Sequence, residues 1–316
     1  MSYAQFGTIA ATDFNALVGG NPVTSSGTLN AVWATGGTTA GYGQTALANV
    51  AVGTTVAAPA QWTSLVSNTA SAASHQGTSI TSVTAPATGG TITYLSAIPT
   101  NLTSIYTGRL NAATQGSTTA NSVAYPSTWS TAITFTHTVT FASGNAARYF
   151  FNAGGQLKVT CSHANTTAGI NLLLNNLASN VGTVVMSSPT SGAVTIAATS
   201  YNGITKIGGG GTAPTIATNS GYYARTTSNA TIFTQTASTG PSGYLGTFIS
   251  MVAKSNGTQG SNGDAGSVIT IYTIWDEVPN GLTAGTGSTT TVTAQAPETT
   301  YLGNTWGTIS ITGTVA

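Results

Sequence analysis

The sequence predicts a mainly β protein: an N-terminal part with short helices, then an antiparallel β-sandwich or jelly-roll-like domain with one inserted helix. The apolar residues of the first third recur at helical spacing, whereas beyond about residue 125 they recur every second residue. The later segments are short and rich in Thr, Val and Ile, with Gly, Asn, Ser or Pro between them. We therefore predict an assembly or attachment region over 1–125 and the β-sandwich over 126–316.

Three helices are predicted in the first region, over residues 11–20, 58–77 and 98–116. The first has Thr12 or Asp13 as its cap and ends at two glycines. The other two carry an apolar face at helical spacing. That face consists of Trp62, Leu65, Val66, Ala70 and Ala73 in the second helix, and of Leu102, Ile105, Tyr106 and Leu110 in the third.

The clearest strand is 130–143, because its residues alternate between an apolar face and a face of threonines. The apolar face holds Ile133, Phe135, His137, Val139 and Phe141. Further strands are predicted at 147–152, 156–162, 183–187, 193–198, 231–237, 246–253, 267–275, 289–295 and 307–314. One inserted helix is predicted at 169–179, from the sequence GINLLLNNLAS.

Three aromatic residues in a row stand beside a basic residue in "ARYFFNAGGQLKV", residues 147–159. We interpret this stretch as a hairpin in the core, with a tight turn at 152–155 between two strands. In a strand, Arg148 and Phe150 would point to one side, and Tyr149 and Phe151 to the other. Both sides would then be covered, with Arg148 stacked on an aromatic ring or bonded to carbonyl groups.

Charged residues make up only 3% of the 316 residues, and six Lys and Arg against five Asp and Glu give a net charge of +1. The chain has no basic stripe for nucleic acid, and no apolar run that would span a membrane. The first residues also lack the pattern of a signal peptide. A surface without charge lacks the repulsion that keeps proteins apart, so we expect a subunit of an assembly, favouring a homotrimer.

The residues that could carry chemistry are few. Cys161 and His163 share one face of a predicted strand, but His75 and His137 are distant in sequence, so we expect a packed thiol and a hydrogen-bonded histidine instead of a metal site. No serine lies in a nucleophile elbow, and the glycines of 208–211 lack the context of a phosphate loop. We expect no catalytic residues and no cofactor.

Sugar hydrolysis needs two carboxyl groups a few ångström apart. The chain offers five: Asp13, Asp264, Asp276, Glu277 and Glu298. Adjacent strand residues point to opposite faces, which argues against pairing Asp276 with Glu277. The pair Asp276 and Glu298 stays open, although exposed carboxylates at strand ends are the favoured interpretation.

The segment 254–267, KSNGTQGSNGDAGS, is predicted to be a long exposed hairpin tip between two strands. Loops held by a rigid sheet often carry binding residues. The candidate contact residues for a receptor or a neighbouring subunit are Lys254, Asn256, Asn262 and Asp264 of this loop, with Tyr272 and Trp275 of the next strand as an aromatic platform. A plain solvated hairpin is the alternative.

Several longer stretches carry a family resemblance. They are ARYFFNAGG, GTVVMSS, YNGITKIGG, GTQGSNGDAG, ITIYTIWDEVPNGL and PETTYLGNTWGT, together with the opening MSYAQFGTIAATDFNALVGG, NAVWATGGTTAGYGQT, QWTSLV and SHQG. In their order along the chain, these stretches resemble structural proteins of tailed bacteriophage virions, of the tail-fibre-like kind. The resemblance covers most of the chain and implies a virion component, without catalytic residues.

Together these expectations describe a non-enzymatic virion subunit in a tail fibre, a baseplate appendage or another external part. Its partners would be further copies of itself, other virion proteins and a glycan of the host surface, and it would act in host attachment. The alternative is a surface domain that binds or degrades carbohydrate. A bacterial surface-layer or adhesin subunit is disfavoured by the lack of a signal peptide.

Overall fold

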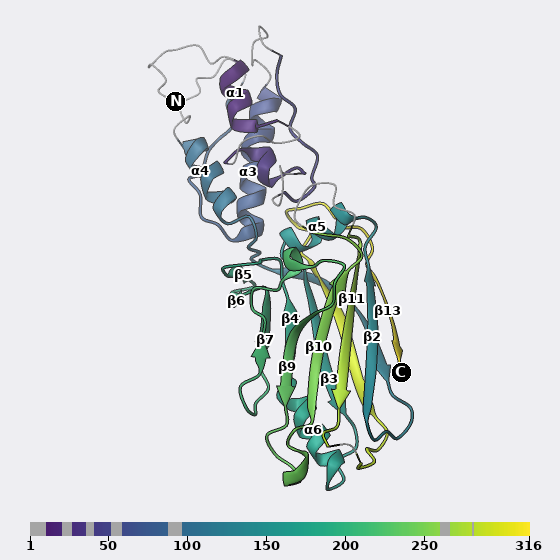
Figure 1. Cartoon of the computed structure of the whole chain (residues 1–316). Helices are drawn as coiled ribbons and strands as arrows, with labels where there is room; N and C mark the ends of the chain where they lie inside the picture. Colours follow the sequence, from purple (N-terminus) through teal and green to yellow (C-terminus); the bar gives the residue numbers. More distant parts are fainter. Residues whose placement is uncertain are drawn as a thin grey trace.

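The computed structural model describes residues 11–20, 27–35, 41–51, 59–87, 97–259, 266–279 and 281–316. Short helices form a bundle that stands on one end of a two-sheet sandwich (Figure 1). The bundle consists of α1 (Ala11–Val18), α2 (Leu29–Val32), α3 (Pro59–Gln76) and α4 (Ala97–Thr107). The predicted helices are therefore present, but α4 ends well before residue 116. Arg109 ends it, because its guanidinium donates to the Tyr106 carbonyl at 2.9 Å and stacks over the Tyr106 ring.

Two antiparallel sheets form the sandwich, which confirms the predicted fold class. The five-stranded sheet has the order β1 (Gln115–Ala124), β12 (Ser288–Pro297), β3 (Gln156–His163), β4 (Thr183–Met186) and β7 (Ile204–Ile207). The six-stranded sheet has the order β13 (Ser310–Val315), β2 (Ala132–Thr140), β11 (Val268–Asp276), β10 (Phe248–Ser255), β9 (Ala230–Thr236) and β8 (Thr215–Ile216). A small pair, β5 (Val194–Ile196) and β6 (Thr199–Tyr201), lies apart from both.

The core lies between the two sheets, where the apolar face of each strand meets the other sheet. In β2, Ile133, Phe135 and Val139 are buried, whereas the threonines between them are partly exposed. The Phe135 and Trp275 rings lie 6.2 Å apart, centroid to centroid. The alternation predicted for 130–143 is therefore confirmed.

The inserted helix is α6 (Ile170–Val181), and it lies at the end of the sandwich that is remote from the helical bundle (Figure 1). Its apolar stripe, Leu173, Leu174 and Leu177, is buried, while Leu172 on the opposite side is 42% exposed. The inserted helix predicted at 169–179 is therefore confirmed, and it buries one apolar face.

The strand predicted at 147–152 is wrong: Gly144–Asn152 forms a helix, α5. Ser143 caps its first turn by accepting a hydrogen bond from the Ala146 amide at 3.1 Å. Gly154, with φ of +86°, ends the turn that follows. Every residue of α5 except Asn145 is buried, so the sequence shows no polar face that would have revealed a helical period.

α5 lies where the bundle meets the sandwich (Figure 1) and binds parts of both. Arg148 is fully buried; it donates to the Thr35 carbonyl at 2.7 Å and lies over the Tyr149 ring, as the sequence predicted for its bonding. Asn152 donates to the Gly41 carbonyl at 2.8 Å and accepts from the Tyr223 hydroxyl at 2.6 Å. The aromatic stretch is thus the junction between the two parts of the chain.

The sandwich begins earlier than the boundary predicted at residue 125. β1 precedes that boundary, yet it pairs with β12 over most of its length. This strand was not predicted because its residues are mostly small and polar, and most of them are exposed. An edge strand with little buried surface has no alternating pattern to detect.

Gly313 of β13 lies against β1, where only a glycine fits. A Cβ atom at this position would overlap the Val123 side chain and would lie 2.5 Å from Asn121 Oδ1. We expect Gly313→Ala to lower the free energy of unfolding by about 1–3 kcal/mol, because β1 and β13 must move apart. Urea unfolding measures this, and Gly243→Ala, where nothing lies within 4 Å of the added atom, is the matched control. Equal losses in the two variants would contradict the packing argument.

Candidate functional site

Two of the predicted contact residues, Lys254 and Tyr272, lie together on the outer face of the six-stranded sheet. The Lys254 ammonium group is 5.6 Å from the centroid of the Tyr272 ring, which is within the range of a cation–π contact. Both side chains are partly exposed, whereas the alternate residues Ala253 and Ile271 face the core. The pair therefore offers a small surface with one aromatic ring and one positive charge.

Trp275 does not belong to this surface, so its predicted role as part of an exposed aromatic platform is wrong. It is 0% exposed, and its indole N–H donates to Thr290 Oγ1 at 3.4 Å. Tyr272 and Trp275 are three residues apart in a strand, so they point to opposite faces. Tyr272 lies outside and Trp275 packs between the sheets.

The base of the predicted loop is partly packed, and its tip, residues 260–265, lies outside the described residues. Gln259 is buried; it donates to Ser255 Oγ at 2.7 Å and accepts from the Tyr222 hydroxyl at 2.7 Å. Asn256 is exposed, and its Oδ1 accepts from the Val268 amide at 2.9 Å, which closes the hairpin. Asn262 and Asp264 lie outside the described residues.

This hairpin lies at the bundle end of the sandwich, and not at the end remote from the bundle. Val268 pairs with Thr140 at the end of β2 that leads into α5, so the hairpin lies at the end of the sandwich that carries the helical bundle. The opposite end carries α6 (Figure 1). A partner of the hairpin would therefore approach beside the bundle, and the contact role of Lys254, Asn256 and Tyr272 stays a prediction.

The carboxylate pair left open by the sequence is separated by the length of the sandwich. Asp276 pairs with Ala132 at the α6 end, whereas Glu298 follows Pro297, next to the Gln295–Gln156 pair at the α5 end. Strands of this length span roughly 25–30 Å, well beyond the spacing of hydrolase carboxylates. Asp276 and Glu298 therefore do not act on one sugar bond.

Glu277 differs from its neighbour in being fully buried. Its Oε1 accepts from the Leu282 amide at 3.1 Å, so the side chain holds the turn after β11. Burial raises the pKa of both Glu277 and the partly exposed Asp276. The two side chains lie in different environments, as expected of adjacent strand residues, and Glu277 is a structural residue of this turn.

His163 and Cys161 have the packing roles that the sequence predicted. His163 donates from Nε2 to Asn171 Oδ1 at 3.1 Å and accepts at Nδ1 from the Ser288 hydroxyl at 3.0 Å. Burial lowers the pKa of this histidine, so its neutral form is favoured. Within the described ranges, no three His, Cys, Asp or Glu side chains gather in a way that could hold a metal ion.

Cys161 packs against the core, and its sulfur lies 4.0 Å from Thr290 Oγ1. Burial raises the pKa of the thiol to about 12, so almost no reactive thiolate is present at neutral pH. We expect Cys161→Ala to retain the fold and any assembly, at a cost of roughly 1–2 kcal/mol of stability. We also expect native protein to react with a thiol reagent much more slowly than unfolded protein; equal rates would contradict the burial of the sulfur.

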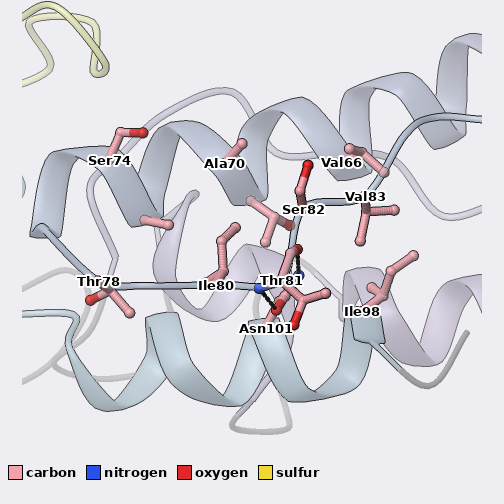
Figure 2. A pocket seen from close by; sticks show the side chains of 12 residues that line it. Val66, Ala70, Ser74, Thr78, Ile80, Thr81, Ser82, Val83, Ile98 and Asn101 are labelled. Atoms are coloured by element: carbon pink, nitrogen blue, oxygen red, sulfur yellow. Dashed lines mark hydrogen bonds between the residues drawn. The ribbon is translucent and has the colours of Figure 1, made fainter. Parts of the chain in front are cut away.

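A cavity of about 250 Å³ lies in the helical bundle, between α3, α4 and the extended segment that follows α3 (Figure 2). Asn101 fixes that segment, because its side chain exchanges two hydrogen bonds with the Thr81 backbone, at 2.8 and 3.0 Å. The cavity is lined by Val66, Thr69, Ala70, Ala73, Ser74, Thr78, Ile80, Thr81, Ser82, Val83, Ile98 and Asn101. None of these side chains is titratable, so the lining offers no acid, base or nucleophilic thiol for catalysis.

A comparison with protein-family models, curated proteins and solved structures found no match to this chain. The resemblance to phage virion proteins is therefore a prediction that these comparisons leave open. None of the helices that the structure describes is long and apolar enough to cross a membrane.

The residues that hold the molecule together at its junction escaped the analysis of the sequence. Tyr42 is buried; its hydroxyl donates to the Arg109 carbonyl at 2.9 Å and accepts from Gln76 at 2.8 Å. His75 donates to the Ala153 carbonyl at 3.0 Å, which connects α3 to the end of α5. The sequence did carry local signs of helix α5: a serine before the aromatic stretch, Ser143, and a glycine after it, Gly154, are usual at helix ends.

Proposed function

We propose that this protein is a non-enzymatic structural component of a tailed phage virion, in a tail fibre, a baseplate appendage or another external part. The observation that carries the proposal is a two-sheet sandwich in a chain with a net charge of only +1 and 3% charged residues. Its outer faces bear mainly threonine and serine. Such faces lack the charge repulsion that keeps separate molecules apart.

The arrangement of the two parts supports an attachment role. The helical bundle sits at one end of the sandwich, and the opposite end is closed by α6 (Figure 1). The buried network around α5 joins the two parts, so a bundle that is held in place also holds the sandwich in place. We infer that the bundle attaches the subunit to other virion proteins and that the sandwich projects outward.

The same proposal assigns it to the virion, as a symmetric homo-oligomer with a trimer favoured, in contact with other virion proteins and a host surface glycan. It requires no cofactor, nucleic acid or membrane. Mass spectrometry of purified virions tests it, with antibodies against the sandwich to locate the subunit by electron microscopy. Peptides of this chain in density-purified particles are expected; their loss on purification would overturn the proposal.

Assembly through uncharged surfaces leads to a salt prediction. We expect the dissociation constant of the oligomer to change less than tenfold between about 0.05 and 1 M NaCl, because few charges are present to be screened. Analytical ultracentrifugation at several salt concentrations measures this. A rise of tenfold or more would show that the few charged residues carry the contacts.

The alternative is a surface domain that binds carbohydrate, and one observation favours it: Tyr272 is exposed in part beside Lys254, between Thr136 and Val252 of the neighbouring strands. Aromatic rings stack on sugars, and the hydroxyl groups of Thr136 and Thr270 beside the ring offer hydrogen bonds. Glycan-array binding that Tyr272→Ala abolishes, and that Tyr301→Ala retains, would support this alternative. Tyr301 is a suitable control because it is 45% exposed elsewhere on the molecule.

A further inference from the structure

The sandwich has two sides at which an edge strand of one sheet meets an edge strand of the other, and one of these sides is protected against pairing with further strands. On that side the edge strands β7 and β8 lie next to each other and are only four and two residues long. Lys206 of β7 points inward and donates to Gln235 Oε1 at 3.2 Å, which ties the two sheets together. Short edge strands and inward charges are the usual devices that prevent edge-to-edge association.

On the other side β13 packs against β1 at Gly313 and Val123, with no hydrogen-bonded ladder between the two strands, and β1 has neither device. β1 is ten residues long, QGSTTANSVA, without a charged residue or a proline. Its pairing with β12 is regular from Thr118 to Ala124, after one irregularity at its start. Residues 117–120 are all exposed, so this part of the strand is open on both of its faces.

The free hydrogen-bonding groups of β1 follow from its register. The Tyr125 amide donates to the Ser288 carbonyl at 2.8 Å, which sets the phase of the β1–β12 ladder. Antiparallel pairs alternate between bonded and non-bonded positions, so Thr118, Ala120, Ser122 and Ala124 direct their backbone groups away from β12. Among the described residues, no backbone group outside β12 pairs with residues 118–124.

We propose that β1 pairs antiparallel with β1 of a second copy of this chain, which joins two five-stranded sheets into one continuous sheet across a two-fold axis. The contact rests on the assembly role in the proposed function and names a surface that self-associates. As a two-fold contact it joins two subunits, or two trimers, and it is distinct from the contacts within a trimer. Backbone groups supply the bonds in such strand addition, and small side chains leave room for a second strand.

The lack of charge fits a second copy as the partner. A two-fold antiparallel contact sets residue i opposite residue j of the partner and j opposite i, so a charge near the axis would face its own equivalent. β1 has none. The nearest cation, Lys158, lies beside the Gln115 end, within 3.5 Å of Gln115 Oε1 and 3.3 Å of Gln295 Oε1. Antiparallel pairing puts the two Lys158 side chains at opposite ends of the contact, whereas parallel pairing would bring them together.

Single cysteines test the contact and its direction. In the Cys161→Ala background, one cysteine is placed in turn at each exposed position of β1, residues 117–120, 122 and 124, and the protein is oxidised mildly. Antiparallel self-pairing predicts disulfide-linked dimers with one maximum near the two-fold axis and declining yields on both sides. Parallel pairing predicts similar yields at every position, and the control Thr160→Cys, exposed on the interior strand β3, should give none.

A second pair of variants tests whether the contact drives association. Ala120→Pro removes an outward amide and leaves the β12 ladder intact, and Thr119→Lys adds a charge to the edge. Each should raise the dissociation constant at least about tenfold, without a change in the circular dichroism spectrum, whereas Thr160→Lys should leave it unchanged. A monomeric wild-type protein at about 100 μM, equal cross-linking along β1, or an oligomer insensitive to both variants would each overturn the proposal.

These outcomes are distinct from those that test the virion role. If the chain is found in virions but β1 does not cross-link, the function stands and the contact is wrong. If β1 cross-links but the chain is absent from virions, the contact stands and the virion role is wrong.

Discussion

Replacement of Phe151 by alanine is expected to lower the free energy of unfolding by about 3–5 kcal/mol. Phe151 is 0% exposed and lies at the junction of the bundle and the sandwich. Its ring stacks on Tyr222 with centroids 4.3 Å apart, and meets the Phe150 ring edge-on at 5.0 Å. The substitution removes both contacts and leaves a cavity that the surrounding strands fill only in part.

Urea or thermal unfolding measures this loss, and Tyr301→Ala is the control. Tyr301 is 45% exposed, so its removal should change stability by less than about 0.5 kcal/mol. Because α5 binds both parts of the chain, we expect Phe151→Ala also to separate their unfolding into two transitions. A single transition, with a loss no larger than that of Tyr301→Ala, would contradict the role of α5 as the junction.

Acidification from pH 7 to about 4 is expected to destabilise the protein through its buried histidines. His75 is 2% exposed, and burial lowers its pKa from 6.5 to about 4, in spite of the opposing effects of the Ala153 carbonyl and the Glu298 carboxylate. The unfolded chain takes up a proton near pH 6.5, whereas the folded chain resists it until about pH 4. The stability from neutral His75 is therefore complete above pH 6.5 and is lost as the pH falls toward 4, at a cost of about 3 kcal/mol.

Among the other buried groups, some lower the stability of the protein as the pH falls and one raises it. The pKa values of His137 and His163 are also lowered by burial, so these residues add to the loss in acid. Burial raises the pKa of Glu277, so the folded state takes up this proton first and gains stability as the pH falls. The comparison of wild type with a single variant separates these effects.

His75→Gln is the variant that isolates the histidine. Glutamine can donate to the Ala153 carbonyl but does not titrate, so the difference in unfolding free energy between pH 7 and pH 4.5 should shrink by about 2–3 kcal/mol. Denaturant titrations at the two pH values measure it. An unchanged difference would show that His75 is not the group that resists protonation.

The sequence determined the fold class because most strands have one face in the core and one in solvent. β2 shows this in its alternation of Ile, Phe and Val with Thr, and α6 shows the helical counterpart in its leucine stripe. The position of Cys161 on a packed strand followed from the same rule. Where solvent covers one side of an element, the pattern of residues reports which side is buried.

Only the tertiary structure decided the elements that lack one face in the core and one face in solvent. α5 is buried on nearly all sides, so its aromatic residues fitted a strand as well as a helix; β1 is exposed on most of its surface, so it showed no pattern at all. Long-range geometry decided the rest: it put Trp275 in the core and placed Asp276 and Glu298 at opposite ends of the sandwich. A local pattern carries no information on which distant segments meet, because that depends on how the two sheets pair and pack.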